Sequence, residues 1–275
     1  MVFSYKGVTI YYEVHGRGIP IVMIHGGGPD YLLMKGCMEP IFKFGEAYKR
    51  IYFDLPGMGR STTAEWITSS DDMLEVVLQF ISTVLPDQKF LLAGESYGGY
   101  LARGVISQLK SRVQGLLMIC PVIKEPKDRD LPEKKVLVKN AELLASLAPD
   151  DRKFYEDIAV VQDEKTWRHY EQYILPGLKR ADFNFLEKIM SSGYAFSQEV
   201  DSNIGVFEKP TLLLTGRQDA NVGYQDALAL IENYPRGTFA VLDKAGHCLE
   251  SEQNNVFECL TKEWLNRCLD SVNEK

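Results

Sequence analysis

The stretch 94–99, with the sequence Gly-Glu-Ser-Tyr-Gly-Gly, places a serine between small residues directly after the apolar run 90–93. A Gly-x-Ser-x-Gly sequence between a strand and a helix is typical of a nucleophile elbow, a sharp turn that exposes the serine hydroxyl. The pattern alone is weak, because glycine and serine are common residues. The strand character of 90–93 and the helical spacing of apolar residues in 97–106 supply the context that it needs. Ser96 is therefore the predicted nucleophile.

A serine hydroxyl needs a base that takes its proton and a third group that orients the base. Of the four histidines in the chain, His247 follows the last predicted strand, at the sheet edge where the elbow also lies. Asp219 follows the preceding strand in the same way and is the predicted orienting acid, with a helix N-cap as the alternative for this residue. The order serine, acid, histidine along the chain is that of nucleophile-elbow enzymes.

An acyl-transfer site also needs donors for the developing oxyanion, and the loss of one typically costs about 2.7–4 kcal/mol of barrier. The stretch 25–29, His-Gly-Gly-Gly-Pro, predicts a loop whose backbone comes close to a substrate, and the N–H of Tyr97 is the second predicted donor. A phosphate-binding loop is the competing interpretation. It fails because no Gly-Lys-Ser/Thr follows, and no Gly-x-Gly-x-x-Gly is present with an acidic residue downstream. His25 itself is interpreted as structural.

These motifs together resemble the motif set of the α/β-hydrolase superfamily, and they come in that family's order. They are the loop 25–29, the turn 54–61 (Asp-Leu-Pro-Gly-Met-Gly-Arg-Ser), the elbow 94–99, the stretch 216–219 (Gly-Arg-Gln-Asp) and the pair 246–247 (Gly-His). The resemblance implies Ser96 as nucleophile, His247 as base, Asp219 as acid, and Gly27 and Tyr97 as oxyanion donors. A serine at the elbow, where an aspartate would be expected for dehalogenase or epoxide-hydrolase chemistry, argues against both of those activities.

The His-Gly-Gly opening is also similar to that of prolyl iminopeptidases, a family of serine aminopeptidases. Two departures favour an esterase: the loop continues Gly-Pro-Asp where those enzymes have Pro-Gly, and the turn at 54–57 resembles the esterase type. That family also holds the substrate amine with glutamates, and the spacing selects none of the available ones, which are Glu142, Glu156, Glu171 and Glu187. Gly28, Trp167 and Tyr170 are candidate substrate contacts, with packing inside the cap as the alternative for the two aromatic residues.

Strands and helices alternate along the first part of the chain, which predicts an α/β fold with a mostly parallel sheet and helices on both faces. The predicted strands are 8–14 (an antiparallel edge strand), 20–24, 50–53, 90–93, 115–120, 211–215 and 238–242. Between the predicted strands 115–120 and 211–215 the chain shows amphipathic helical stretches and no convincing strand. We therefore expect a core of residues 1–121 and 204–275, interrupted by an all-helical cap, 122–203, that covers Ser96 at the position where the family carries its cap domain.

The composition is that of an ordinary globular protein, with 45% hydrophobic and 25% charged residues. A net charge of −7 and the lack of a basic stripe argue against a nucleic-acid partner. The five cysteines form no Cys-x-x-Cys pair and are odd in number, which predicts reduced thiols in a cytoplasmic protein and no metal site. No apolar segment approaches membrane-spanning length.

The predicted function is that of a serine hydrolase that acts through an acyl-enzyme on a small ester or related carbonyl substrate, without a metal or organic cofactor. Two alternatives stay open: an aminopeptidase that releases N-terminal proline or another small residue, and a ligand-binding signalling protein that keeps the triad but turns over slowly. The sequence predicts neither the leaving group, nor the acyl length, nor the oligomeric state.

Overall fold

The computed structural model describes residues 1–42 and 47–273, and side chains as far as residue 271. Among these residues eight strands form one sheet in the order β1-β2-β4-β3-β5-β6-β9-β10. The strands are β1 (Val2–Tyr5), β2 (Val8–His15), β3 (Ile19–Ile24), β4 (Tyr48–Phe53), β5 (Phe90–Glu95), β6 (Val113–Ile119), β9 (Thr211–Gly216) and β10 (Gly237–Leu242). Strands β1, β2 and β4 pair antiparallel, and all pairs from β4 to β10 are parallel. The fold is therefore α/β with a mostly parallel sheet, as predicted.

The prediction that 8–14 is an edge strand is wrong, because β1 pairs outside it. Val2 lies opposite Tyr11 and Tyr5 opposite Val8, so β2 lies between β1 and β4. A two-residue turn with positive φ at Lys6 (44°) and Gly7 (83°) closes this hairpin. The glycine accommodates the positive φ that such tight hairpin turns require.

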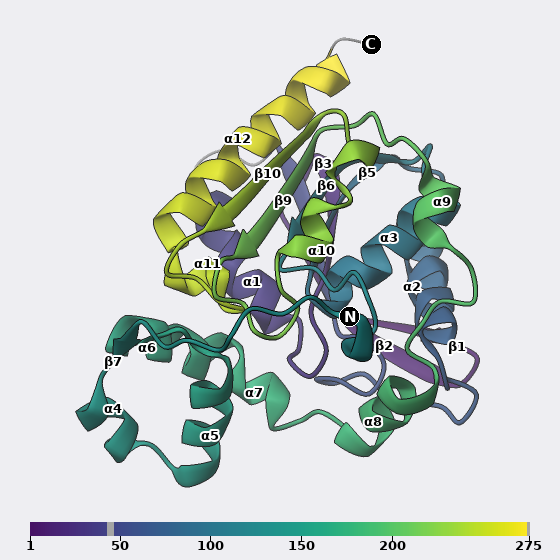
Figure 1. The fold of residues 1–275 in the computed structure, drawn as a ribbon. Helices are drawn as coiled ribbons and strands as arrows, with labels where there is room; N and C mark the ends of the chain where they lie inside the picture. The colour runs from purple at the N-terminus through teal and green to yellow at the C-terminus, as the bar shows by residue number, and fades with distance from the viewer. Residues whose placement is uncertain (43–46, 274–275) are drawn as a thin grey trace.

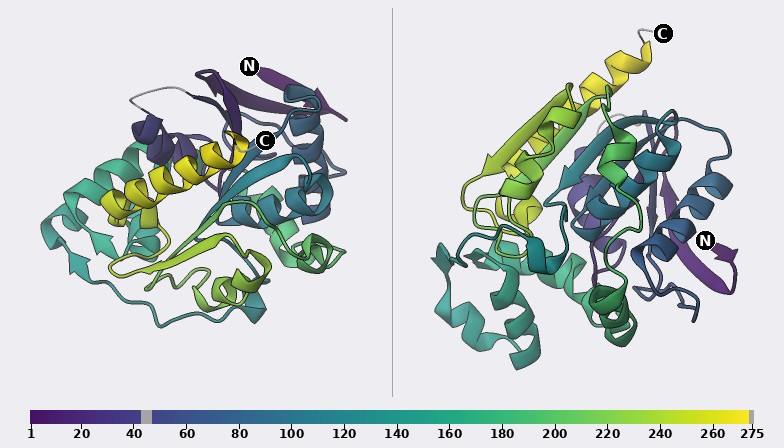
Figure 2. Two further views of the ribbon diagram at one scale, coloured as in Figure 1. Left: turned by 90° about the horizontal axis from the view of Figure 1, so that it is seen from above. Right: turned by 45° about the vertical axis from the view of Figure 1, so that its right-hand side comes forward.

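Helices cover both faces of the sheet (Figure 2). On one face lie α1 (Leu32–Met38), the short 3-10 helix η1 (Glu39–Phe42) and α12 (Asn254–Asn273); on the other lie α2 (Ser70–Val84), α3 (Tyr97–Leu109), α10 (Gln225–Leu228) and η3 (Ile231–Asn233). Helix α2 is capped by Ser69, which shares a capping box with Asp72. No described helix combines the length and the apolar character needed to cross a membrane.

The central strands are buried on both faces, as the apolar runs of the sequence predict. Every residue of β5, β6 and β9 is buried. Their side chains form one continuous apolar core with those of the helices on either face. This rigid core holds the loops at the carboxyl ends of the strands, where the candidate chemistry lies.

Most of the segment between β6 and β9 lies beyond the carboxyl ends of the strands, and its last helix lies back beside α3 (Figure 1). It contains η2 (Pro126–Asp128), β7 (Val138–Lys139), α4 (Ala141–Ser146), α5 (Pro149–Ile158), β8 (Val161–Gln162), α6 (Glu164–Tyr173), α7 (Leu175–Leu178), α8 (Phe183–Ser192) and α9 (Val200–Ile204). The expectation of an insertion without strands is wrong in one detail, because β7 and β8 form a short parallel ladder. Helix α5 ends at Ile158, before two β-branched valines that favour extended backbone. The expected boundary at residue 203 falls inside α9, which packs against α3.

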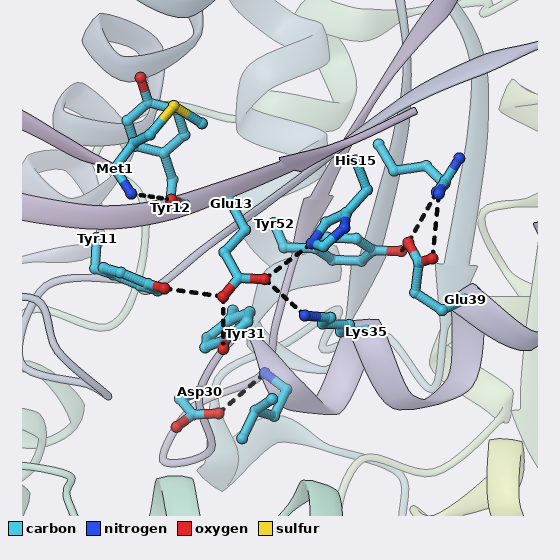
Figure 3. A network of polar contacts seen from close by, with 12 residues as sticks. Met1, Tyr11, Tyr12, Glu13, His15, Asp30, Tyr31, Lys35, Glu39 and Tyr52 are labelled. Atoms are coloured by element: carbon cyan, nitrogen blue, oxygen red, sulfur yellow. Dashed lines mark hydrogen bonds and ion pairs between the residues drawn. The ribbon is translucent and has the colours of Figure 1, made fainter. Parts of the chain in front are cut away.

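A partly buried polar network fixes α1 to β2 (Figure 3). The carboxylate of Glu13 accepts hydrogen bonds from Tyr11 (2.8 Å), Tyr31 (2.9 Å) and Lys35 (2.6 Å), and it lies 2.9 Å from His15 Nε2. Partial burial raises the pKa of Glu13, but hydrogen bonds led by those from Lys35 and His15 outweigh burial and lower it to about 2. Because Tyr31 and Lys35 follow directly after the glycine loop, the network holds that loop against the sheet.

Candidate active site

Ser96 occupies the turn between β5 and α3 with φ 51° and ψ −116°, a backbone conformation that L-residues rarely adopt. Its N–H donates to Ile119 O at 2.9 Å, and its carbonyl accepts from Val122 N at 3.0 Å. A side chain at Gly98 would collide with the carbonyl oxygen of Ile24, so only glycine allows α3 to approach β3 this closely. The turn therefore has the geometry of a nucleophile elbow.

The three residues singled out by the sequence come together at this turn. His247 Nε2 lies 2.9 Å from Ser96 Oγ, and His247 Nδ1 lies 2.9 Å from Asp219 Oδ2. The other carboxylate oxygen of Asp219 accepts the N–H groups of Asn221 (2.9 Å) and Val222 (3.1 Å), which fixes its orientation. Asp219 is fully buried and the His247 side chain is 10% exposed. The arrangement can pass a proton from the hydroxyl to the imidazole while the carboxylate orients the ring.

Cys120 brings a third potential metal-ligating atom close to Asp219 and His247. Among the described residues, ligand atoms of Cys120, Asp219 and His247 lie within 4.8 Å of one another. Both ring nitrogens of His247 already face Ser96 and Asp219. Burial raises the pKa of the Cys120 thiol well above its ordinary value, which disfavours the thiolate that metal binding needs. A metal ion does not fit these donors without breaking both hydrogen bonds.

The glycine loop lies beside the elbow. A Cβ built on Gly26 would lie 3.1 Å from Ser96 Cβ, and one on Gly27 would lie 3.7 Å from Tyr97 Cβ. Gly27 is exposed, whereas its neighbours Gly26 and Gly28 are buried. The N–H of Tyr97 belongs to the first turn of α3, where backbone donors have no partner within the helix. Gly27 and Tyr97 therefore lie side by side next to the Ser96 hydroxyl.

His25 joins the glycine loop 25–29 to the turn 54–61 through hydrogen bonds. Its Nδ1 lies 2.7 Å from Gly26 O, and its Nε2 accepts the N–H of Leu55 at 2.9 Å. Burial lowers the pKa of His25 to about 4, so the ring is neutral at pH 7. The turn is held in the same way by Asp54, whose carboxylate accepts Tyr31 N (2.9 Å) and Arg60 N (2.8 Å).

The insertion covers this edge of the sheet. Residues from its first part and from the end of α5 surround a narrow opening above His247, together with the loop after β9. The lining residues are Lys134, Lys135, Asp157, Ile158, Ala159, Val160, Gln218, Ala220, Asn221 and His247. The free volume of the opening is about 10 Å³, room for about one water molecule.

Charged side chains join the insertion to the core at several points. Glu252 accepts the N–H groups of Val160 (2.6 Å) and Val161 (3.0 Å) from the insertion, and that of Gly246 (2.6 Å) beside His247. At the start of the insertion, the buried Asp226 accepts the N–H of Asp130 at 3.0 Å. These contacts hold the first segment of the insertion to the core as a surface loop.

The candidate substrate contacts of the insertion are placed elsewhere. Trp167 is 7% exposed and Tyr170 is 1% exposed. The ring centroid of each lies 5.1 Å from that of Tyr155. They form an aromatic core inside the insertion and do not line the opening. Gly28 is covered by the cap residue Leu178, whose Cδ2 would lie 3.0 Å from a Cβ at that position. The structure brings none of the three to the opening above His247.

Two buried carboxyl groups beside His247 were missed by the sequence interpretation. Glu95 ends β5 and its Oε1 lies 3.4 Å from His247 Nε2; Glu250 belongs to α11 (Leu249–Glu252), and its Oε2 has no hydrogen-bond partner within the described part of the chain. Burial raises the pKa of Glu95 to about 8 and that of Glu250 to about 7. A charged residue at the end of an otherwise apolar strand was the available signal for Glu95.

Comparison with known proteins agrees with the fold. The family described as serine aminopeptidase, S33, matches residues 19–254. A pimeloyl-(acyl-carrier protein) methyl ester esterase of Legionella pneumophila (strain Paris) is 26% identical over 267 residues, which cover 94% of this chain and 100% of the relative. A 2-hydroxy-6-oxononadienedioate/2-hydroxy-6-oxononatrienedioate hydrolase of Burkholderia vietnamiensis is 23% identical over 267 residues, which cover 94% of this chain and 92% of the relative.

Solved structures share the whole architecture. An alpha/beta superfamily hydrolase from Oenococcus oeni PSU-1 superimposes with a TM-score of 0.87 at 27% identity, covering 98% of this chain and 99% of that one. A thermophilic esterase from Thermogutta terrifontis has the same fold, with a TM-score of 0.64 at 20% identity over 97% of both chains. The similarity extends through the sheet and the insertion alike.

Proposed function

This chain belongs to the serine aminopeptidase S33 family of α/β-hydrolases, and on that premise we propose that it hydrolyses a small carboxylic ester through an acyl-enzyme. The observation that carries the proposal is the run of two 2.9 Å contacts from Ser96 through His247 to Asp219 at a nucleophile elbow. A relative that is named a methyl ester esterase and others that are named hydrolases support a hydrolytic reaction.

In this mechanism Ser96 Oγ attacks the ester carbonyl while its proton passes to His247 Nε2. The imidazolium that forms donates its Nδ1–H to the carboxylate of Asp219, and the negative charge of that carboxylate stabilises it. His247 then gives the proton to the leaving alcohol, and the acyl group stays on Ser96. In the second half His247 takes a proton from water while the water oxygen attacks the acyl carbon. The bond from that carbon to Ser96 Oγ then breaks, His247 returns the proton to Oγ, and the acid leaves.

The negative charge that develops on the carbonyl oxygen needs donors, and we assign this part to the backbone N–H groups of Gly27 and Tyr97. Their position beside Ser96 supports the assignment, as does the exposure of Gly27 in an otherwise buried loop. The α3 N-terminus adds a favourable dipole at the same point. The insertion, taken as a cap over residues 122–203, excludes water and thereby strengthens these interactions.

An aminopeptidase is the second candidate, and the name of the family favours it. It requires an acidic group that holds the substrate amine. Four glutamates were candidates for binding the substrate amine. Three of them are exposed: Glu142, Glu171 and Glu187. The fourth, Glu156, pairs with Arg152 at 2.8 Å on the surface of the insertion. None of these four lines the opening above His247, so none is placed to hold a substrate amine there.

The experiment is a substrate panel of short-chain nitrophenyl esters and aminoacyl anilides, with Ser96→Ala as the blank. We expect the wild-type protein to hydrolyse the esters rapidly and a proline anilide slowly. The Ser96→Ala variant should hydrolyse neither. Faster turnover of the proline anilide would make the protein an aminopeptidase. Slow hydrolysis of every substrate, together with stabilisation by an unreacted ligand, would indicate a binding protein that keeps the triad.

A further inference from the structure

Glu95 directly precedes the proposed nucleophile and shares its histidine partner. Its Oε1 lies 3.4 Å from His247 Nε2, the same nitrogen that lies 2.9 Å from Ser96 Oγ. Glu95 is 3% exposed, and the N–H of Gly26 donates to its carboxylate. Its carboxyl group is thus held against the imidazole from behind the glycine loop, where a substrate does not reach it.

A carboxyl group and an imidazole at this distance can hold one proton in two ways. In the first, the proton is on Glu95, and the lone pair of Nε2 is free to accept the Ser96 hydroxyl. In the second, the O–H bond on Glu95 is broken and an N–H bond on Nε2 is formed, which leaves a carboxylate and an imidazolium. The net charge of the pair is the same in both. Only the first arrangement has a base that can take the serine proton.

We propose that Glu95 is a positioning residue that competes with Ser96 for Nε2 of His247 and so sets the pH at which this histidine becomes available as a base. The proposal rests on the proposed function of Ser96 and His247. It adds a second carboxylate to the histidine, on the nitrogen opposite to the one that Asp219 orients.

The charges around the pair favour the imidazolium form. Burial by itself lowers the pKa of His247, but the charge and hydrogen bond of Asp219, with the charges of Glu95 and Glu250, raise it to about 9. Three thiols also face the pair, those of Cys37 in α1, Cys120 after β6 and Cys248 before α11. So does the carboxylate of Glu252 in α11. The charged side chains that line the opening are Lys134, Lys135 and Asp157. Burial keeps the three thiols neutral, so the acids dominate.

Two titration steps follow from this arrangement. As the pH rises, the pair loses a first proton and becomes partly active, because the remaining proton is shared between Glu95 and His247. It becomes fully active only when the second proton leaves. In a Glu95→Gln variant the histidine has one carboxylate partner, so we expect a single acid limb, shifted to lower pH by about one unit or more.

The experiment measures the rate at which a small fluorophosphonate labels Ser96 between pH 5 and pH 10, in the wild type and in Glu95→Gln. Glu142→Gln, an exposed carboxylate-to-amide change in α4, is the matched control and should leave the profile unchanged. A two-step acid limb that becomes one step at lower pH supports the proposal. Coincident profiles for the wild type and Glu95→Gln overturn it, because a merely structural role would change the rate and leave the pH dependence.

A second measurement separates this proposal from the proposed function. Nuclear magnetic resonance of protein labelled with ¹⁵N-histidine follows the titration of His247 directly and requires no reaction. If the wild type resists the probe at every pH, the proposed function fails, and this titration still decides the part of Glu95. Should Glu95→Gln fail to fold, the wild-type titration suffices: two coupled steps are expected, and a single step near pH 6.5 contradicts the proposal.

Discussion

Ser96 is held in a backbone conformation that costs about 1–3 kcal/mol for a residue with a side chain. The cost is offset by the hydrogen bonds of its backbone to the chain after β6, and it places the hydroxyl 2.9 Å from the imidazole. The residue types needed for this arrangement are specific enough for the sequence to predict, since small residues must surround the serine. Glu95 was not predicted, because its partner His247 is distant in the sequence and no motif joins them.

At the same scale, Asp219→Asn tests the orienting acid. The amide presents a donor or a weaker acceptor to Nδ1, so the imidazole adopts the wrong tautomer and kcat should fall by about 10⁴-fold with the fold intact. Ester hydrolysis and circular dichroism, measured on the same samples, check this. Undiminished hydrolysis by the variant would show that another group orients His247.

Glu250 is expected to make stability depend on pH. Its pKa in the native state is raised to about 7, so the folded protein keeps a proton that the unfolded chain loses near pH 4.5. Stability therefore falls as the pH rises from about 4.5 to 7, and Glu250→Gln should remove a penalty of about 3 kcal/mol at pH 8. Thermal unfolding at pH 5 and pH 8 measures this. A gain in Tm that is equal at both values would contradict it.

At the scale of elements, the central strands β3, β5, β6 and β9 were predictable because each contains an apolar run bounded by turn residues. Strand β1, which has only four residues, was not predicted. The insertion was harder. Helix α5 ends at Ile158 because the backbone of the next residues pairs with Glu252 and β7. Such a pairing partner lies almost a hundred residues away, and local spacing carries no information about it.

Glu252 joins two elements that must keep their places for catalysis, since its carboxylate binds both β8 and the loop of His247. In Glu252→Gln one oxygen becomes a donor that faces a backbone N–H, so one of the two links is lost at a cost of about 1–3 kcal/mol. We expect faster amide exchange at Val160 and Val161 and a lower kcat/KM. Glu258→Gln, which removes a surface pair with Lys262 in α12, is the control. Unchanged exchange in Glu252→Gln would contradict the link.

At the scale of the whole molecule, the insertion is joined to the core at several points and lines a narrow opening above His247. Its general place followed from the loss of strand alternation after residue 120. Which of its aromatic residues face the substrate could not be predicted, because a helical aromatic serves equally well in packing. The structure places Trp167 and Tyr170 in packing.

Trp167→Ala is therefore expected to loosen the insertion without altering the chemistry at Ser96. Removal of a buried tryptophan costs about 3–5 kcal/mol, so limited proteolysis should cut first within 122–203. Labelling of Ser96 by a small fluorophosphonate should persist. A changed acyl preference with unchanged Tm would instead place Trp167 in the substrate pocket, as the sequence predicted.

The central claim is that an acyl group is carried by Ser96. Rapid mixing with nitrophenyl acetate, acid quenching and mass spectrometry of the digested protein test it directly. The account predicts a burst of nitrophenol and an acetyl group on the peptide that contains Ser96, with both absent in Ser96→Ala. An acetyl group on another residue, or full turnover by Ser96→Ala, would contradict it.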